Sequence, residues 1–158
     1  MNMPDSLASL IERGGIHHAP GGNSVQQVIE TVVKMIPVPE TIRPQDLFRA
    51  IMEREALMST GIGGGIAIPH PRNPITARPE EQFVSLVFLD RAVDWRALDG
   101  KPVDTLLLLV CASAKLHLQT LSAVSFFCGR DEFVKMLREK VTHETLIRYI
   151  RETEKLWK

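Results

Sequence analysis

The chain has 158 residues, 44% of them hydrophobic, and 19 Lys and Arg residues balance 19 Asp and Glu residues. This length and composition predict one globular domain over residues 1–158, with a core large enough to need no metal or disulfide. The balanced charge argues against a dedicated nucleic-acid-binding protein, because such domains usually carry a basic excess. We find no run of about 18 apolar residues and no basic leader, so we expect a cytoplasmic protein that does not insert into membranes. Cys111 and Cys128 are interpreted as buried thiols.

The first third of the chain shows helical periodicity. Apolar spacing predicts a helix around Leu7–Ile11 and a second helix over Val25–Ile36. A short extended segment, Ile16–Ala19, is expected between them. Pro44 suits the first turn of a third helix, in which we expect Leu57 to face inward.

The middle of the chain is rich in predicted strands. Phe83–Leu89 and Thr105–Cys111 are short apolar runs bounded by turn residues, as expected of buried strands. Asp99–Gly100 is a hairpin-type turn signal. It predicts that strands near Val93–Leu98 and Val103–Val110 pair in antiparallel fashion.

Helical spacing returns in the last third. One helix is expected to turn Leu118 and Phe127 inward, and a further element surrounds Phe133–Leu137. Thr142 is expected to cap a final helix. Helices at both ends and strands in the middle predict a layered α/β or α+β domain, with a sheet covered by helices.

A glycine-rich loop runs from Thr60 to Gly65. A P-loop ends in Gly-Lys-Ser/Thr, whereas Gly65 is followed by Ile66 and Ala67. The dinucleotide fingerprint fails as well, because the loop follows a predicted helix and Ile66 occupies the position of its third glycine. We interpret the loop as backbone that needs positive φ angles, and we expect no nucleotide cofactor.

Two histidines lie in contexts that suit chemistry. His70 lies between Pro69 and Pro71, which favours an extended backbone and presents the imidazole from a stiff segment. Histidine can act as a nucleophile near neutral pH. The alternative is a surface or strand-end histidine that has no catalytic role. His117 opens the helix after the last strand and, taken alone, is equally well explained as a residue near a helix cap.

The charged residues near His70 are all cationic. Between Ala56 and Pro79 the only formal charges are Arg72 and Arg78. Arg54 ends the preceding helix, where the helix dipole alone accounts for a cation. A guanidinium near a nucleophilic histidine would also hold a phosphoryl group by two hydrogen bonds. No metal site is predicted, because the five histidines and two cysteines lack the spacing of metal ligands.

The segment Arg54–His70, REALMSTGIGGGIAIPH, resembles the signature of the type-2 EIIA domains of the bacterial phosphoenolpyruvate-dependent phosphotransferase system. These domains form its fructose/mannitol and nitrogen-regulatory branch. The match continues through Ala97–Asp104 and into the helix that contains His117, so it covers nearly the whole chain. The resemblance implies a three-layer α/β/α sandwich with a mixed sheet.

The resemblance also implies roles for four residues. His70 would accept a phosphoryl group from a phosphorylated HPr-like carrier protein and pass it on, which requires an exposed imidazole. His117 would support the phosphohistidine as the second active-site histidine. Arg54 would contact the phosphate, and Thr60 would lie close by. No cofactor or metal is implied, because the loose transition state of phosphoryl transfer needs positioning and positive donors.

Three functions are compatible with this resemblance. The favoured one is a phosphocarrier of the nitrogen-regulatory type, since we find neither a permease nor a cysteine-bearing EIIB domain in the sequence. Its downstream partner would be an EIIB domain or a regulated protein. The alternatives are the EIIA component of a fructose/mannitol-type transporter and a non-catalytic binding module of the same fold. The joint presence of Arg54, His70 and His117 argues against the binding module, whereas homodimer formation stays open.

Two residues depart from the usual pattern of the resembled family. Pro71 follows the active histidine, where a small residue or glycine is common, and Cys111 stands where we expect a proline. A proline removes one backbone N–H and stiffens the loop. We expect these departures to affect the choice of partner and not the class of protein.

Overall fold

The computed structural model describes residues 6–156. Its helices are α1 (Leu7–Gly14), α2 (Val25–Met35), α3 (Pro44–Leu57), α4 (Ala114–Cys128), α5 (Asp131–Arg138) and α6 (His143–Leu156), with a 3-10 turn at Pro79–Glu81. Its strands are β1 (Ile16–Ala19), β2 (Gly61–Gly63), β3 (Ile66–Ala67), β4 (Phe83–Val93) and β5 (Val103–Val110). Every helix within residues 6–156 is too short or too polar to span a membrane.

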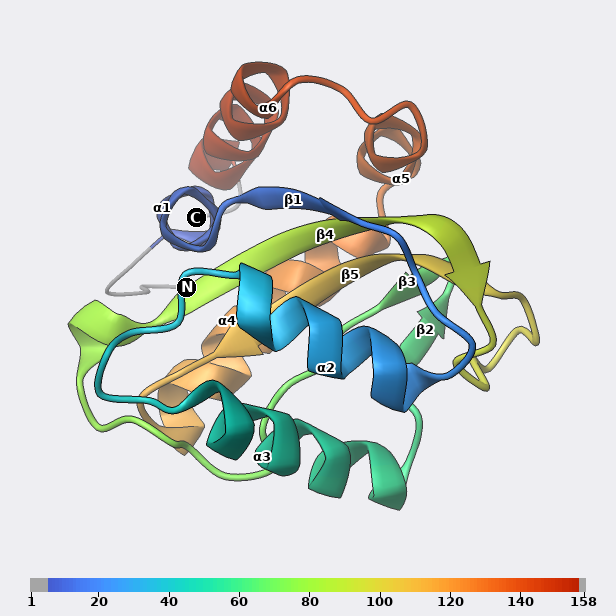
Figure 1. Cartoon of the computed structure of the whole chain (residues 1–158). Coiled ribbons are helices and arrows are strands. Elements are labelled where there is room, and N and C mark those ends of the chain that lie inside the picture. Colours follow the sequence, from blue (N-terminus) through green and yellow to red (C-terminus); the bar gives the residue numbers. More distant parts are fainter. Residues whose placement is uncertain (1–5, 157–158) are drawn as a thin grey trace.

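The five strands of the described chain form one mixed sheet in the order β1-β4-β5-β3-β2 (Figure 1). β4 and β5 are antiparallel, with Val84 opposite Leu109, whereas β1 is parallel to β4 and β3 is parallel to β5. Since β3 and β5 run in the same direction, their C-terminal ends lie at the same edge of the sheet. The segment after β3 therefore lies beside the start of α4, which follows β5.

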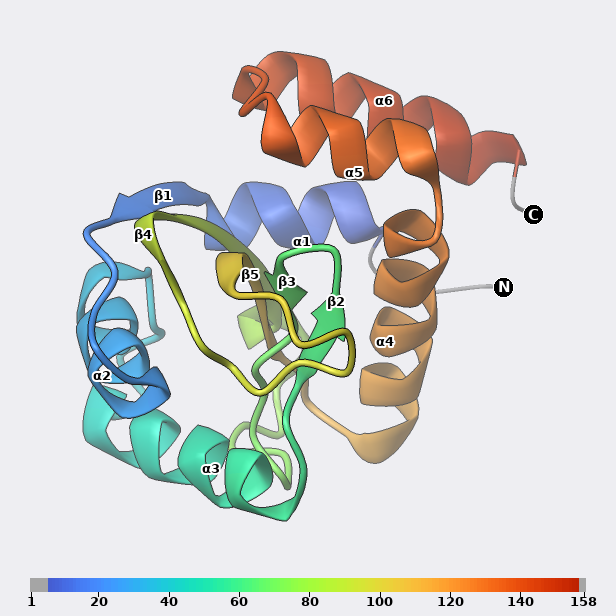
Figure 2. The ribbon, with the colours of Figure 1, turned by 90° about the vertical axis from the view of Figure 1, so that its right-hand side faces the viewer.

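Helices cover both faces of the sheet. α2 and α3 lie on one face, and α1, α4, α5 and α6 lie on the other (Figures 1 and 2). The two apolar cores follow the alternation of side chains along the strands: Val87 and Leu106 pack on the α2–α3 side, and Leu86 and Leu107 pack on the opposite side. The three-layer α/β/α sandwich with a mixed sheet is confirmed.

The helix boundaries follow signals in the sequence. Ser6, Ser24 and Ser113 each accept a hydrogen bond from a backbone N–H three residues later, at the starts of α1, α2 and α4. α1 ends at Gly14, where a Cβ atom would lie 2.1 Å from the carbonyl oxygen of Val84. A glycine is therefore needed for the last turn of α1 to approach the backbone of β4.

The predicted strand near Val93–Leu98 is wrong. The strand that pairs with β5 is β4, which runs from Phe83 to Val93, and residues 94–102 form a loop. Trp95 turns into the core and is 1% exposed. Arg96 has a φ of 57°, in the left-handed region that interrupts an extended strand.

Two predicted core residues lie on the surface. Leu57, the last residue of α3, is 60% exposed, and Leu118, near the start of α4, is 63% exposed. Helical spacing predicts which residues share a face of a helix. It does not predict which turns of that face are covered by other elements, and both residues lie in turns near a helix end.

Candidate functional site

His70 lies just beyond β3, at the sheet edge where β5 ends. The β2–β3 hairpin reverses through Gly63–Gly65, whose φ angles of 100°, 66° and 82° suit glycine. Beyond the hairpin, the carbonyl oxygen of Pro69 accepts a hydrogen bond of 3.0 Å from the N–H of Leu109 on β5. The chain is therefore held to the sheet both before β3, through the β2–β3 hairpin, and after it, through the bond from Leu109 to Pro69.

His117 lies against His70. The ring centroids are 4.6 Å apart and the ring planes are inclined by 43°. His117 lies in the first turn of α4, and its N–H donates to the carbonyl oxygen of Ser113, 2.9 Å away. The structure thus brings together the two histidines that the sequence motifs singled out.

A backbone carbonyl determines which ring nitrogen of His70 carries the proton. Nδ1 lies 2.7 Å from the carbonyl oxygen of Ile68. Because a carbonyl oxygen only accepts hydrogen bonds, Nδ1 must be the donor. The neutral ring therefore has its free electron pair on Nε2, which is the nitrogen available for nucleophilic attack.

His70 is buried, whereas transfer between two proteins led us to expect an exposed imidazole. Only 6% of its surface is exposed. Pro69 and Pro71 on either side are buried, and the ring of His117 lies against the imidazole. A partner can therefore reach His70 from a narrow range of directions only.

Burial and positive charge favour the neutral form of both histidines. Burial lowers the pKa of His70, the hydrogen bond to Ile68 raises it, and the charge of Arg54 lowers it again, with a net lowering. Burial, followed by the charges of His70 and Arg54, lowers the pKa of His117 to about 4. Both imidazoles are therefore neutral at pH 7, the form in which a histidine has a free electron pair.

The depressed pKa of His117 predicts a loss of stability in acid. Above pH 6.5 this histidine is neutral in the folded and the unfolded chain, so it contributes no pH dependence. Between pH 6.5 and about 4 the unfolded chain binds a proton that the folded chain does not, so the free energy of unfolding falls as the pH falls. We expect a His117→Asn variant to show a flatter curve of Tm against pH in this window, measured by scanning calorimetry.

His143→Asn is the matched control for this measurement, because His143 is exposed at the start of α6. It should retain the pH dependence of the wild type. A His117→Asn variant that loses as much Tm as the wild type between pH 6.5 and 4 would show that the folded-state pKa of His117 is not depressed.

Arg54 supplies the fixed positive charge of the site. It lies in the last turn of α3, close enough to lower the pKa of both histidines. Its Nη1 donates to the carbonyl oxygen of Met58, 2.6 Å away, which anchors the guanidinium at the helix end. A guanidinium has five N–H donors, so one anchoring bond leaves donors of the geometry that binds phosphoryl oxygens.

Thr60 is buried, and its hydroxyl is engaged away from the histidines. Its side chain donates to the carboxylate of Glu55 and accepts a hydrogen bond of 3.2 Å from Nε1 of Trp95. The direct phosphate contact expected of Thr60 would require its hydroxyl proton to leave Glu55. The sequence motifs did not indicate Glu55 or Trp95 as site residues, and the one available signal was the position of Glu55 next to Arg54.

A pocket of about 280 Å³ opens beside His117. It lies between the loop 71–74 and the start of α4, and the exposed side chain of Leu118 lines it. Pro71 and Cys111, the two residues that depart from the resembled pattern, both line this pocket. Burial raises the pKa of the Cys111 thiol, so the pocket wall carries a protonated and not an ionised sulfur.

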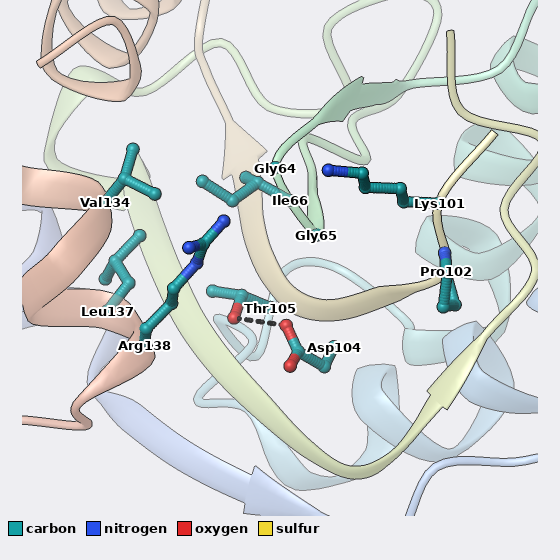
Figure 3. Close-up of a pocket in the computed structure, with 10 residues that line it drawn as sticks. All are labelled: Gly64, Gly65, Ile66, Lys101, Pro102, Asp104, Thr105, Val134, Leu137 and Arg138. Atoms are coloured by element: carbon teal, nitrogen blue, oxygen red, sulfur yellow. Dashed lines mark hydrogen bonds between the residues drawn. The ribbon is translucent and has the colours of Figure 1, made fainter. Parts of the chain in front are cut away.

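A second pocket, of about 310 Å³, lies at the opposite end of β3. Figure 3 shows the side chains of Lys101, from the loop before β5, and Arg138, from α5, beside this pocket, with Asp104 hydrogen bonded to Thr105. Its lining includes charges of both signs and none of the histidines. The histidine pair is therefore the stronger candidate for the functional site.

The site combines two neutral imidazoles with a fixed guanidinium. Among residues 6–156, no three His, Cys, Asp or Glu side chains gather as metal ligands would. A nucleophilic nitrogen with a nearby cation suits the acceptance of a phosphoryl group, because that transition state needs positioning and positive donors.

Comparison with known proteins identifies the family. The family model described as phosphoenolpyruvate-dependent sugar phosphotransferase system, EIIA 2, matches residues 9–153. The chain therefore belongs to this family, and the resemblance seen in its motifs is confirmed.

Two relatives illustrate the range of the family. A nitrogen regulatory protein of Pseudomonas aeruginosa is 35% identical over 142 residues, which are 84% of this chain and 86% of that protein. A PTS system fructose-specific EIIABC component of Bacillus subtilis is 29% identical over 133 residues, which are 82% of this chain and 20% of that longer protein.

Solved structures share the fold. The nitrogen regulatory protein IIA-Ntr of Neisseria meningitidis superposes with a TM-score of 0.71 at 24% identity, covering 85% of this chain and 92% of that one. Enzyme IIAMTL, solved in complex with phosphorylated enzyme IIBMTL from Escherichia coli, has a TM-score of 0.60 at 15% identity, covering 87% and 94%. At these identities the likeness concerns the fold alone.

Proposed function

We propose that the chain is a phosphocarrier in which His70 accepts a phosphoryl group from a phosphorylated HPr-like protein and passes it on. The observation that carries the proposal is the His70–His117 pair, with ring centroids 4.6 Å apart and under the influence of the Arg54 charge. Membership of a family that serves a phosphotransferase system supports the same activity. In this proposal phosphoenolpyruvate is the indirect donor, and the HPr-like protein is the direct one.

The transfer step requires no metal and no net proton movement at His70. Nε2 attacks the phosphorus atom, a bond between Nε2 and phosphorus forms, and the phosphorus–nitrogen bond in the carrier breaks. The electron pair returns to the carrier's imidazole, whose other nitrogen bears a proton and which therefore leaves as a neutral ring. His70 keeps its proton on Nδ1, so the carbonyl oxygen of Ile68 faces the positive charge of the phosphorylated ring.

The neighbouring side chains have complementary roles in this proposal. His117 is neutral at pH 7 before phosphorylation and supports the phosphohistidine through the contact between the two rings. Arg54 binds the phosphoryl oxygens and neutralises part of their charge in the transition state. We assign Thr60 to the support of this site and not to phosphate binding, because its hydroxyl proton is used by Glu55.

Exposed apolar side chains lie close to His117 and Arg54 in the chain. Leu118 lies one residue from His117, and Leu57 and Met58, at the end of α3, are 60% and 67% exposed. We propose that the carrier docks across these residues, since the buried core of an interface is more apolar than the rest of a protein surface. Docking there would bring a phosphorylated side chain to the narrow opening at His70.

A regulatory role fits the relatives better than transport of one sugar. The nitrogen regulatory relative matches over 86% of its length, whereas the fructose-specific relative matches over 20%. We therefore propose that the phosphorylation state controls binding to other proteins. The second candidate is transfer to an EIIB domain, because the fructose-specific relative belongs to the same family.

The test is incubation of the chain with phosphoenolpyruvate, enzyme I and an HPr-type protein. We expect one phosphoryl group per chain, labile to acid and stable to alkali, with phosphorus NMR assigning it to Nε2. A chain that stays unlabelled while the HPr-type protein is phosphorylated would refute the phosphocarrier proposal. That outcome would favour the non-catalytic binding module.

A further inference from the structure

A buried polar cluster lies directly behind the segment that carries His70. The carboxylate of Glu55 accepts hydrogen bonds from the N–H of Thr60 at 3.2 Å, from the hydroxyl of Thr60 and from Nε1 of Trp95 at 3.3 Å. Thr60 is 3% exposed and Trp95 is 1% exposed, whereas Glu55 is half-buried, so the two donor residues are shielded from water. Buried polar groups left without partners are costly, so the cluster holds its three members in one arrangement.

Two hydrogen bonds connect this cluster to the ring of His70. The carbonyl oxygen of Thr60 accepts a hydrogen bond of 3.0 Å from the N–H of Ile68. The carbonyl oxygen of Ile68 in turn accepts from Nδ1 of His70, 2.7 Å away. Thr60 therefore restrains Ile68 through its N–H, and the carbonyl of the same residue orients the imidazole and determines its tautomer.

The same cluster holds the end of α3, where Arg54 lies. Glu55 follows Arg54 in the last turn of α3, so bonds to its carboxylate restrain the backbone from which the guanidinium extends. Gly61, which follows Thr60, packs closely against Ala97: a Cβ atom on Gly61 would lie 2.8 Å from the Cβ of Ala97. The backbone next to Thr60 therefore has little room to move. Both parts of the site, the cation and the nucleophile, thus depend on one carboxylate that contacts neither histidine through any hydrogen bond found in the described chain.

We propose that Glu55 is a positioning residue: through Thr60 and Ile68 it orients the ring of His70, and through the last turn of α3 it holds Arg54 beside that ring. The inference rests on the proposed phosphocarrier function. Phosphoryl transfer depends on alignment of the nucleophile with the phosphorus atom, so a small loss of alignment lowers the rate constant more than it lowers affinity for the carrier.

The kinetic test compares Glu55→Ala and Thr60→Val with the wild type. We expect each variant to accept the phosphoryl group at least about tenfold more slowly, with little change in the KM for the phosphorylated HPr-type protein. Glu55→Gln and Thr60→Ser keep a hydrogen-bonding group in place and should restore most of the rate. Glu53→Ala, an exposed carboxylate on the same helix, is the matched control and should behave as the wild type.

The second readout does not require phosphorylation. Nitrogen NMR of His70 should show the proton on Nδ1 in the wild type and a mixture of tautomers in Glu55→Ala. Trp95→Phe keeps one aromatic ring in the core and removes the N–H together with the rest of the indole. It is the second variant to measure if Glu55→Ala does not fold, and it should shift the tautomer in the same direction. A folded Glu55→Ala or Trp95→Phe variant with wild-type tautomer and wild-type rate would overturn the inference. An unlabelled wild type would refute the phosphocarrier function instead, and the tautomer measurement would still decide the role of Glu55.

Discussion

A His70→Ala variant is expected to lose phosphoryl acceptance completely. The substitution removes Nε2, the nitrogen that the hydrogen bond from Nδ1 to Ile68 leaves free for attack. We do not expect His117 to replace it. His117 lies near the start of α4, whereas the β2–β3 hairpin positions His70. The measurement is incorporation of labelled phosphate from phosphoenolpyruvate through enzyme I and an HPr-type protein, compared at equal times with the wild type.

Two other histidine variants make this experiment decisive. His18→Ala, an exposed residue on β1, should be labelled as the wild type is. His117→Ala should still be labelled, with slower onward transfer or a changed lifetime of the phosphohistidine, because it keeps the nucleophile and loses the supporting ring. Equal labelling of His70→Ala and the wild type would show that His70 is not the nucleophile.

The second large effect is expected for Arg54→Gln, which keeps most of the side chain and removes its charge. Loss of one donor that stabilises a transition state typically lowers a rate constant by about 100-fold or more. Arg54 also lowers the pKa of His70, so its removal raises that pKa. The acid limb of the profile of acceptance rate against pH should therefore move to higher pH, and rapid-quench measurements across this range report both effects.

The controls separate charge from helix stability. Arg49→Gln, on the exposed surface of the same helix, should leave the rate and the pH profile unchanged. Arg54→Lys keeps the charge and loses the two-pronged geometry, so its rate should lie between those of the wild type and Arg54→Gln. A rate for Arg54→Gln within twofold of the wild type would exclude a role for this arginine in phosphate binding.

Local patterns predicted most of the fold. The helical face of α2 follows from apolar periodicity, and the buried strands β4 and β5 follow from short apolar runs bounded by turn residues. The short strand β1 lies where an extended segment was expected. The failures lie where tertiary contacts override local signals. Trp95 lies in a loop where a strand was predicted, and its indole N–H donates hydrogen bonds to Glu55 and Thr60 in the interior. Leu57 is exposed because no layer covers the end of α3.

The candidate site was predicted in part. The motifs indicated His70, His117 and Arg54, and the structure places the two rings 4.6 Å apart with the charge of Arg54 acting on both. The burial of His70 and the engagement of the Thr60 hydroxyl could not be read from spacing, because both depend on segments distant in the sequence. The roles of these four residues stay predictions until the variants are measured.

The sequence by itself determined the family, the layered α/β class and the identity of the paired histidines, because these depend on residue types at short, recognisable spacings. Only the tertiary structure decided which nitrogen of His70 is free, how far its ring is covered and which residues hold it. Those properties arise from the carbonyl of Ile68, the ring of His117 and the carboxylate of Glu55, which folding brings together from separate elements. Hydrogen bonds and desolvation act over a few ångströms in space, and no periodicity along the chain encodes them.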